Sequence, residues 1–411
     1  GVTISGLAIQ NARINAVSSF YSELEILECS LPIYEYSTGV RAWFSELNIS
    51  QSSITGTPGL ISGGIVSIET NVTITDSSIT DHFKGSESSA IYLLGGVLAL
   101  IEDCQITGNI AETGGGLGIY DMLDVTIRNC SITGNTASGF QALGGGIYLS
   151  NISVRDSVVL IEDCDISDNE AASGGGIYNG TCGRVTLRKN SISGNRATSG
   201  GGMYNDIIGE LIIGGDVGNS NAFMNNTAYT GVDIFSERLP ETPHNARYNT
   251  FSGYCQSEYY VTPQAAFDLT GSTSQFVPIT QDVYVSPSGD DSNDGLSWNS
   301  PFRTISHATS NVYGTEEQPI NIYLAEGVYS PSLTGESCPI NLVSHVNLVG
   351  DSAETTVIDA EGTGGVIYGS HVQSTEMYDL TIRGGGGNYG MGVRMTGGNL
   401  RIHDVLITDN E

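Results

Sequence analysis

Residues 161–178 read IEDCDISDNEAASGGGIY and contain a short alternating strand, a polar turn around Asn169, a glycine cluster and the start of a second strand. Close copies lie at residues 127–148 and 187–204, and a looser copy lies at residues 101–120. Self-similarity at a fixed period is the signature of a solenoid, propeller or array. The stretch is therefore one repeat of a larger stack.

A pattern of apolar-x-x-small-x-apolar places eight units in register. The first apolar position is Ile4, Ile26, Ile49, Ile74, Ile101, Ile127, Ile161 and Leu187, and the second is Ile9, Leu31, Ile54, Ile79, Ile106, Ile132, Ile166 and Ile192. Successive units are separated by 22, 23, 25, 27, 26, 34 and 26 residues. Three short strands with their turns fit this period, and Gly-Gly-Gly would break a helix. We therefore predict an all-β fold, a right-handed parallel β-helix solenoid whose equivalent residues stack about 4.8 Å apart.

Two further columns accompany the apolar ones. Between the two apolar positions lie Leu7, Cys29, Ser52, Ser77, Cys104, Cys130, Cys164 and Asn190. We expect the cysteines of this column to be buried free thiols, because a small apolar side chain packs well at an inward position; an occasional disulfide is the alternative. Cys182, Cys255 and Cys338 lie off the column, and the sequence assigns them no partner. The second column, Asn109, Asn135, Asn169 and Asn195, is expected to satisfy backbone groups at a recurring turn, since Asn tolerates a left-handed conformation.

The interval of 34 residues holds about eight extra residues, around residues 138–143 and 151–157. Extra residues in one rung must leave the shaft as loops, and loops on a rigid scaffold often carry binding sites. A tolerated surface insertion is the alternative interpretation.

The chain is strongly acidic, with 45 Asp and Glu, 15 Lys and Arg, and a formal net charge of −30. Phosphate binding depends on clustered Lys and Arg, so this balance argues against a nucleic-acid partner. An anionic membrane would also repel the chain, and no run of about 18 apolar residues predicts a membrane-spanning helix. The acidity suits an extracellular surface; the alternative is that it only keeps a long β surface apart from its neighbours.

The repeat pattern fades after about Phe235, which predicts a first β-helix over residues 1–235. Residues 236–280 concentrate Pro, Tyr and polar residues, as expected of a cap and linker. Short strands return over residues 281–411, with a capping helix at about 301–312, and predict the start of a second β-helix. Both ends of the chain lie inside strand-like segments, which predicts a longer repeated chain or end-to-end assembly of the protein with itself.

Two families share motifs with the chain. GGGIY and ISGN(x)A within residues 100–235 resemble the repeats of polymorphic outer membrane proteins, which are secreted right-handed β-helix proteins of bacterial surfaces. YVSPSGDDSNDG, PFRTIS, LAEGVYS, NLVGD and VIDAEG within residues 284–359 resemble the opening segment of pectate-lyase-like β-helix domains of bacterial exoproteins. The resemblance implies an exported bacterial protein. It does not imply one activity, because the same shaft carries lyases, hydrolases, adhesins and inert stalks.

The candidate metal site is the loop of Asp290, Asp291, Asn293 and Asp294. Its closely spaced hard oxygen ligands are followed by Gly295, which allows the turn that points carboxylates at Ca²⁺. The loop matches the first half of an EF-hand, but Pro301 stands at the twelfth position in place of Glu. A metal-free turn held by Asx hydrogen bonds is the alternative.

Catalytic constellations are harder to find. A lyase of this fold needs a basic residue near carboxylate-held Ca²⁺, whereas Lys84 and Lys189 lie near no Asp cluster, and the basic group of Arg184, Arg188 and Lys189 adjoins no acidic set. A glycoside hydrolase needs two carboxylates across a cleft. The in-register residues Glu102, Asp103, Glu162 and Asp163 are interpreted instead as a solvated acidic ladder.

The leading hypothesis is therefore a non-catalytic structural or adhesive β-helix protein of a bacterial surface. A polysaccharide lyase or glycoside hydrolase is the rival. A carbohydrate-binding β-helix is the third option, with Tyr120, Tyr148, Tyr178 and Tyr204 as an exposed aromatic row. These tyrosines could equally stack as a structural ladder.

Overall fold

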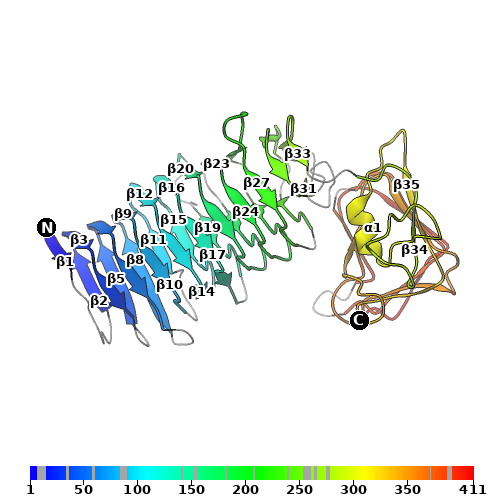
Figure 1. Cartoon of the computed structure of the whole chain (residues 1–411), viewed down its shortest axis with the longest axis horizontal. Helices are drawn as coiled ribbons and strands as arrows, with labels where there is room; N and C mark the ends of the chain where they lie inside the picture. Colours follow the sequence, from blue (N-terminus) through cyan, green and yellow to red (C-terminus); the bar gives the residue numbers. More distant parts are fainter. Residues whose placement is uncertain are drawn as a thin grey trace. The chain divides into compact units, whose positions relative to one another are not determined.

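The computed structural model of the chain describes residues 1–6, 15–33, 37–57, 61–83, 90–139, 142–150, 156–180, 183–206, 209–228, 230–237, 240–252, 261–262, 266–274, 278–370, 372–386 and 391–411 (Figure 1). The chain divides into two compact units. Unit 1 comprises residues 1–252 and 265–273, and unit 2 comprises residues 253–264 and 274–411.

Unit 1 is a coil of three parallel sheets. Sheet 1 contains β1 (Val2–Ser5), β3 (Glu23–Leu27), β6 (Glu46–Ser50), β9 (Asn71–Thr75), β12 (Leu98–Glu102), β16 (Asp124–Arg128), β20 (Val158–Glu162), β23 (Arg184–Arg188), β26 (Glu210–Ile213), β29 (His244–Asn245) and β32 (Phe267–Asp268). Sheet 2 contains β4 (Ser30–Pro32), β7 (Ser53–Thr55), β10 (Ser78–Thr80), β13 (Gln105–Thr107), β17 (Ser131–Thr133), β21 (Asp165–Ser167), β24 (Ser191–Ser193), β27 (Ala222–Met224), β30 (Thr250–Phe251) and β33 (Thr273–Ser274). Sheet 3 contains β2 (Asn15–Phe20), β5 (Ser37–Trp43), β8 (Ser62–Ile68), β11 (Ile91–Leu94), β15 (Leu117–Tyr120), β19 (Ile147–Ser150), β22 (Ile177–Asn179), β25 (Met203–Asn205) and β28 (Ile234–Ser236). A small pair, β14 (Ile110–Ala111) and β18 (Thr136–Ala137), lies beside them, and β31 (Val261–Thr262) falls within the residues of unit 2.

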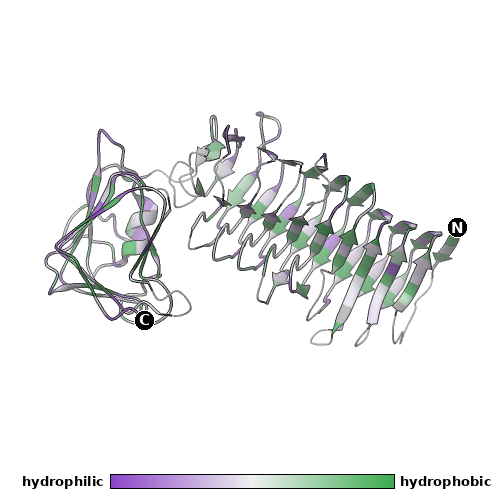
Figure 2. Ribbon diagram, turned by 180° about the vertical axis from the view of Figure 1, so that it is seen from behind, coloured by the Kyte–Doolittle hydropathy of each residue, from purple (hydrophilic) through white to green (hydrophobic). Residues whose placement is uncertain are grey.

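The two apolar columns form the core of unit 1. Ile26, Ile101 and Ile161 in sheet 1 and Ile54 and Ile166 in sheet 2 are fully buried, and apolar residues recur along the strands of the coil (Figure 2). Each buried aliphatic side chain contributes about 1.5–3 kcal/mol. Ile4 pairs in register with Ile26, as predicted. Leu7 and Ile9 lie outside the described residues.

A left-handed bend joins sheets 1 and 2 in each rung. The residues with positive φ there are Glu28, Gln51, Asp76, Asp103, Asn129, Asp163 and Lys189, with φ between 47° and 56°. The next residue in each rung points inward and belongs to the cysteine column. Cys29, Cys104, Cys130 and Cys164 are buried free thiols, which confirms that prediction, and Cys338 is also buried and free. Cys182 and Cys255 lie outside the described residues.

The asparagine column is a continuous hydrogen-bonded ladder. In one link, Asn169 donates from its backbone N and its Nδ2 to Oδ1 of Asn195, at 3.0 Å each, and Nδ2 also donates to the carbonyl of Ile132 at 2.9 Å. Asn109, Asn135, Asn169 and Asn195 are all fully buried. The predicted role is confirmed, but the left-handed residue is the one before each Asn, such as Asp168 with φ 55°.

The ladder explains the glycine cluster. Gly174 adopts φ +66°. A Cβ on Gly176 would lie 2.6 Å from the carbonyl oxygen of Gly202 and 3.1 Å from Nδ2 of Asn195. Glycine is therefore required at Gly174 by the bend and at Gly176 by the close approach of the next rung.

The ladder ends in two buried titratable residues. His82 takes the asparagine position at one end, donates its backbone N to Oδ1 of Asn109 and places Nε2 3.1 Å from the carbonyl oxygen of Ile54. At the other end, Oδ1 of Asp233 accepts from Nδ2 of Asn226 at 2.9 Å, and Oδ2 has no hydrogen-bond partner. Burial lowers the pKa of His82 to about 4 and raises the pKa of Asp233 to about 7.

Strand pairing in unit 1 continues past Phe235, where the sequence pattern fades. β29 and β32 extend sheet 1, with His244 in register with Phe267. β30 extends sheet 2 through Phe251, which stacks on Phe223 at a ring-centroid distance of 5.2 Å. The described residues of the predicted cap and linker thus include strands that lengthen the coil.

Unit 2 contains three further parallel sheets. Sheet 4 contains β34 (Val283–Val285), β35 (Ile320–Leu324), β38 (Val346–Val349), β41 (Thr375–Tyr378) and β44 (Leu400–His403). Sheet 5 contains β36 (Gly327–Tyr329), β39 (Thr356–Asp359), β42 (Thr381–Arg383) and β45 (Leu406–Ile407). Sheet 6 contains β37 (Ile340–Asn341), β40 (Ile367–Ser370) and β43 (Val393–Thr396).

The predicted helix is present as α1 (Ile305–Asn311). It begins at Ile305 because Oγ1 of Thr304 accepts from the backbone N of His307, which is a standard N-cap. The buried carboxylate of Glu336 also accepts from the backbone N of Ile305 and Ser306, at 2.7 and 2.8 Å. No helix among the described residues is long and apolar enough to cross a membrane.

Candidate functional site

The predicted metal loop lies between β34 and α1, and its side chains accept hydrogen bonds from nearby residues. Asp290 accepts from the backbone N and Oγ of Ser292, at 2.9 and 2.8 Å. Asp291 accepts from the backbone N of Arg303 and Thr304, at 2.8 and 3.0 Å. These bonds fix the approach of the chain to α1.

Of the other two predicted ligands, Asp294 also accepts a hydrogen bond, whereas the amide of Asn293 donates one. Oδ1 of Asp294 accepts from Oγ of Ser300 at 2.6 Å, and Nδ2 of Asn293 donates to the carbonyl of Pro301 at 2.8 Å. In the described part of the chain, no group of three or more His, Cys, Asp or Glu side chains is arranged to hold a metal ion. Oδ1 of Asp290 and Oδ1 of Asp291 each accept two hydrogen bonds. A cation bound here would compete with those donors for the same oxygen atoms. A calcium site here stays a prediction.

The prediction of a purely acidic ladder is wrong in one respect, because arginines occupy the rungs between and beyond its glutamates. Along the outer face of sheet 1, Glu102, Arg128, Glu162 and Arg188 follow one another in register. Arg128 Nε lies 2.7 Å from Glu102, and Arg188 Nε lies 2.8 Å from Glu162. The Arg188 guanidinium holds the pKa of Glu162 below its usual value.

The basic group is likewise paired, contrary to the prediction that it adjoins no acidic set. Arg184 contacts Glu210 at 2.5 Å, and Lys189 contacts Glu162 at 3.3 Å. The sequence spacing hid these pairs because the partners are a whole rung apart in the chain. Lys84 lies outside the described residues. Solvent-exposed pairs of this kind contribute about 0–1 kcal/mol each, so their share in the stability of unit 1 is small.

The tyrosines of unit 1 form a stacked column on the outer face of sheet 3. Centroid distances are 5.3 Å between Tyr148 and Tyr178 and 5.1 Å between Tyr178 and Tyr204, with interplanar angles of 16° and 12°. Stacking at this distance covers the ring faces, and the hydroxyls of Tyr178 and Tyr204 donate to the carboxylates of Asp206 and Glu237. Sugars bind aromatic rings through the faces, so this column fits the structural alternative better than a binding row.

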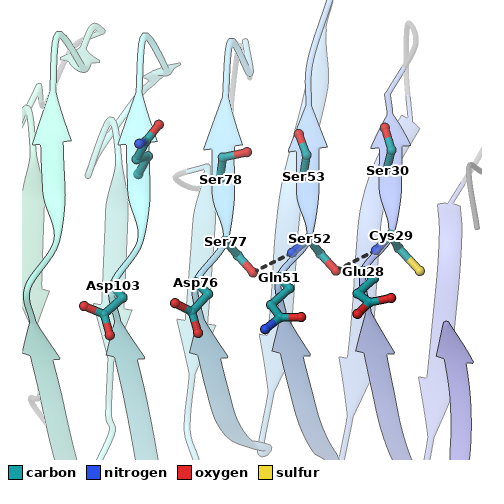
Figure 3. A pocket seen from close by; sticks show the side chains of 11 residues that line it. Glu28, Cys29, Ser30, Gln51, Ser52, Ser53, Asp76, Ser77, Ser78 and Asp103 are labelled. Carbon is teal, nitrogen blue, oxygen red and sulfur yellow. Dashed lines mark hydrogen bonds between the residues drawn. The ribbon is translucent and has the colours of Figure 1, made fainter. Parts of the chain in front are cut away.

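A groove crosses four rungs of unit 1 at the bend between sheets 1 and 2 (Figure 3). It is lined by residues 28–30, 51–53, 76–78, 103 and 105. Glu28, Gln51, Asp76 and Asp103 form one row along it, and Ser30, Ser53 and Ser78 form another (Figure 3). Between the rows, the backbone N of Cys29 donates to Oγ of Ser52 at 3.0 Å, and the backbone N of Ser52 donates to Oγ of Ser77 at 3.1 Å.

In its described residues, the groove lacks the side-chain arrangements of the two carbohydrate-active reactions considered above. Its three carboxylates lie in one row, with Gln51 between Glu28 and Asp76, whereas glycoside hydrolysis needs two carboxyl groups on opposite sides of the bond. Its described lining residues include no Lys or Arg that could act as the base of a lyase.

The two stretches of the long interval differ from the loops that the sequence predicts. Leu143 forms β-bridges with Thr113 and Ser173, so the end of the first stretch belongs to the shaft. Ser157 is buried, and its Oγ accepts from the backbone N of Gly183 at 2.9 Å. Residues 140–141 and 151–155 lie outside the described residues, so binding by these loops stays a prediction.

Unit 2 has an aromatic column that the sequence analysis missed. On the outer face of sheet 4, Tyr284, Tyr323, Val349, Tyr378 and His403 follow one another in register. Tyr284 and Tyr323 stack at 5.5 Å, and Tyr378 and His403 stack at 4.7 Å. The sequence signal is a Tyr at the outward position of the strands VYV, IYL and MYD, which lack the GGGIY motif of unit 1.

Two family models match the chain. Residues 38–209 match the family described as right handed beta helix region, and residues 287–399 match the family described as protein of unknown function (DUF1565). Comparison with curated proteins and with solved structures found no match. The right-handed parallel β-helix predicted from the sequence is confirmed. The finer resemblance to polymorphic outer membrane proteins stays a prediction.

Proposed function

We propose that this right-handed β-helix is a non-catalytic structural or adhesive protein of a bacterial surface. The observation that carries the proposal is the use of polar side chains in ladders. Asn169, Glu162 and Ser52 each hold a partner in a neighbouring rung. Such side chains make a long shaft rigid and regular, whereas an active site gathers them around one reacting atom.

An extracellular location, surface glycans as ligands and assembly with other copies belong to the same proposal. They are supported by the charge of −30, which disfavours nucleic acid and anionic membranes as partners. The rival, a carbohydrate-active enzyme, would need the acidic row of the groove to act as its catalytic carboxylates.

The test is an assay for cleavage of polygalacturonate, xylan and β-glucan by the native protein and by the Asp76→Asn/Asp103→Asn variant. We expect no new reducing ends and no unsaturated products from either protein. Cleavage by the native protein that the double variant lacks would overturn the proposal in favour of an enzyme. Sedimentation of the native protein over a range of concentrations tests self-assembly separately.

A further inference from the structure

The aromatic column of unit 2 is interrupted at Val349. Tyr323 and Tyr378 occupy the register positions on either side of it. In the described part of unit 2, the ring contacts of Tyr323 are with Tyr284 and those of Tyr378 are with His403. One face of each tyrosine is therefore turned toward the rung of Val349 without a ring against it.

The width of this interruption suits a puckered ring. Two rungs of about 4.8 Å place the tyrosine rings about 10 Å apart. A flat ring in contact with both would need only about 7–8 Å, because carbon atoms pack best at about 3.5–4.0 Å. A pyranose chair is thicker than a flat ring, and its axial C–H groups complement the negative faces of the two aromatic rings.

Polar groups lie beside the interruption. Asn347 is two residues before Val349 on the same strand and faces the same way. Its Nδ2 donates to Oδ1 of Asn321, and its Oδ1 accepts from the backbone N of Glu376, both at 3.0 Å. These two bonds fix the amide. An Asn amide has two N–H donors and two lone pairs, so a second donor and a second lone pair can serve sugar hydroxyls.

Both tyrosines are held toward this polar side. The hydroxyl of Tyr378 donates to the carboxylate of Glu376, and Nδ2 of Asn321 lies 3.4 Å from the hydroxyl of Tyr323. The two rings consequently flank the space over both Val349 and Asn347. Two side chains fixed in this way need little ordering when a ligand enters.

The charge of the protein selects among glycans. The net charge of −30 would repel uronate polymers, and Glu376 is already matched by Arg401 at 3.1 Å. We propose that the slot between Tyr323 and Tyr378, over Val349 and Asn347, binds one pyranose ring of a neutral glycan. This inference rests on the adhesive role proposed above and assigns that role a site.

The test compares two identical substitutions on different faces. Val349→Tyr completes the aromatic column and fills the slot. Val357→Tyr places the same ring on the outer face of sheet 5, at a half-buried outward position of β39. The native protein and both variants are titrated by calorimetry with β-glucan, xylan and galactomannan oligosaccharides, and with oligogalacturonate as the charged comparison. Circular dichroism checks that each variant is folded.

We expect at least one neutral oligosaccharide to bind the native protein and the Val357→Tyr variant alike. Val349→Tyr should weaken that binding by about tenfold or more, the loss expected when a ring-stacking contact of about 1.4 kcal/mol is removed. Tyr323→Ala removes one wall of the slot instead of filling it and should weaken binding by a similar factor. This variant provides the test if Val349→Tyr does not fold.

Two results would overturn the slot. One is the absence of binding by every neutral oligosaccharide, and the other is undiminished binding by both Val349→Tyr and Tyr323→Ala. The second result would leave the adhesive role standing with its site elsewhere. Cleavage of a bound glycan by the native protein would instead overturn the non-catalytic role and leave the slot as a substrate-binding site.

Discussion

Each of the two units carries an aromatic column on one outer face, and each column has one register position without an aromatic residue. The two columns differ in whether a ring from elsewhere fills that position. In unit 1, Gly118 occupies the register position between Tyr92 and Tyr148. Tyr120 fills the gap from two residues further along, with its ring centroid 4.9 Å from Tyr92 and 5.2 Å from Tyr148. In unit 2, Val349 holds the corresponding kind of position, and no ring of the described residues fills it. A glycine leaves room for a neighbour's ring, whereas a valine covers the strand itself, so the first column is closed and the second is open.

The polar ladders of the two units differ in the same sense. The asparagine ladder of unit 1 is inside the coil, where water cannot replace a lost partner, and Asn169 is fully buried. The ladder of Asn321 and Asn347 in unit 2 is half-buried and lies beside the open column. The inner ladder of unit 1 therefore depends on its own partners, whereas water reaches the half-buried ladder of unit 2.

The largest effect should come from breaking the inner ladder. Asn169→Ala removes the amide that donates from Nδ2 to the carbonyl of Ile132 and to Oδ1 of Asn195. It also removes the Oδ1 that accepts from Nδ2 of Asn135. We expect unit 1 to lose about 3–5 kcal/mol, because several buried groups are left without partners. The matched change Asn347→Ala should cost unit 2 less than about 1 kcal/mol, since water can replace its partners. Urea unfolding of both variants measures the difference, and equal losses would contradict the comparison.

The closed interior of unit 1 should also show in its dependence on pH. Burial raises the pKa of Asp233 to about 7, so the folded state binds a proton more tightly than the unfolded state. The stability from this group is fully present below its ordinary pKa and is lost as the pH rises through about 7. Asp233→Asn keeps an acceptor for Asn226 and should stabilise the protein at pH 8 by about 3 kcal/mol, with little effect near pH 4. Urea unfolding at both pH values tests this, and an equal effect at the two would refute it.

The other end of the ladder should respond with the opposite sign. Burial lowers the pKa of His82 to about 4, so stability is full above the ordinary pKa of His and is lost as the pH falls through about 4. His82→Asn gives this rung the residue that the next rung has at the same position. The variant should avoid the decrease of about 2–3 kcal/mol in the free energy of unfolding that the native protein shows between pH 7 and pH 4. The measurement is the difference in unfolding free energy between variant and native protein from pH 7 to pH 4. A difference that does not change with pH would contradict the assignment.

Much of unit 1 was predictable because each of its columns repeats a residue type. Ile161, Cys164 and Asn169 have counterparts one rung away, so position in the repeat determines burial. The partners of Arg188 and Lys189 were not predictable by proximity in the sequence, because contacts in a solenoid lie a full rung apart. The open slot was not predictable either. Val349 matters only because Tyr323 and Tyr378 occupy the same register position in the neighbouring rungs.

Opening the closed column tests the comparison directly. Tyr120→Ala recreates in unit 1 the gap that unit 2 has, by removing a ring that contacts Tyr92 and Tyr148. We expect a loss of about 2 kcal/mol, less than for a fully buried aromatic residue, because Tyr120 is only partly buried. Urea unfolding gives the loss. If the gap alone makes a binding slot, the variant should also gain affinity for the glycan that binds unit 2. A stable variant without that gain would show that binding also needs the polar group beside the slot in unit 2, Asn347.

The smallest effect belongs to Glu376, at the edge of the open column. The Tyr378 hydroxyl, and then Arg401 and His403, hold the pKa of this carboxyl below its usual value. Its contribution is present above the ordinary pKa and is lost as the pH falls through the lowered one. Because the group is exposed and screened by water, Glu376→Gln should lower the stability of unit 2 only slightly at pH 7, and by less as the pH falls below the ordinary pKa of Glu. Unfolding followed by Trp298 fluorescence in a Trp43→Phe background separates unit 2 from unit 1, since the chain has two tryptophans. A large loss at pH 7 would mean that the surface ladder of unit 2 stabilises its coil as the inner ladder stabilises unit 1, and the contrast between them would fail.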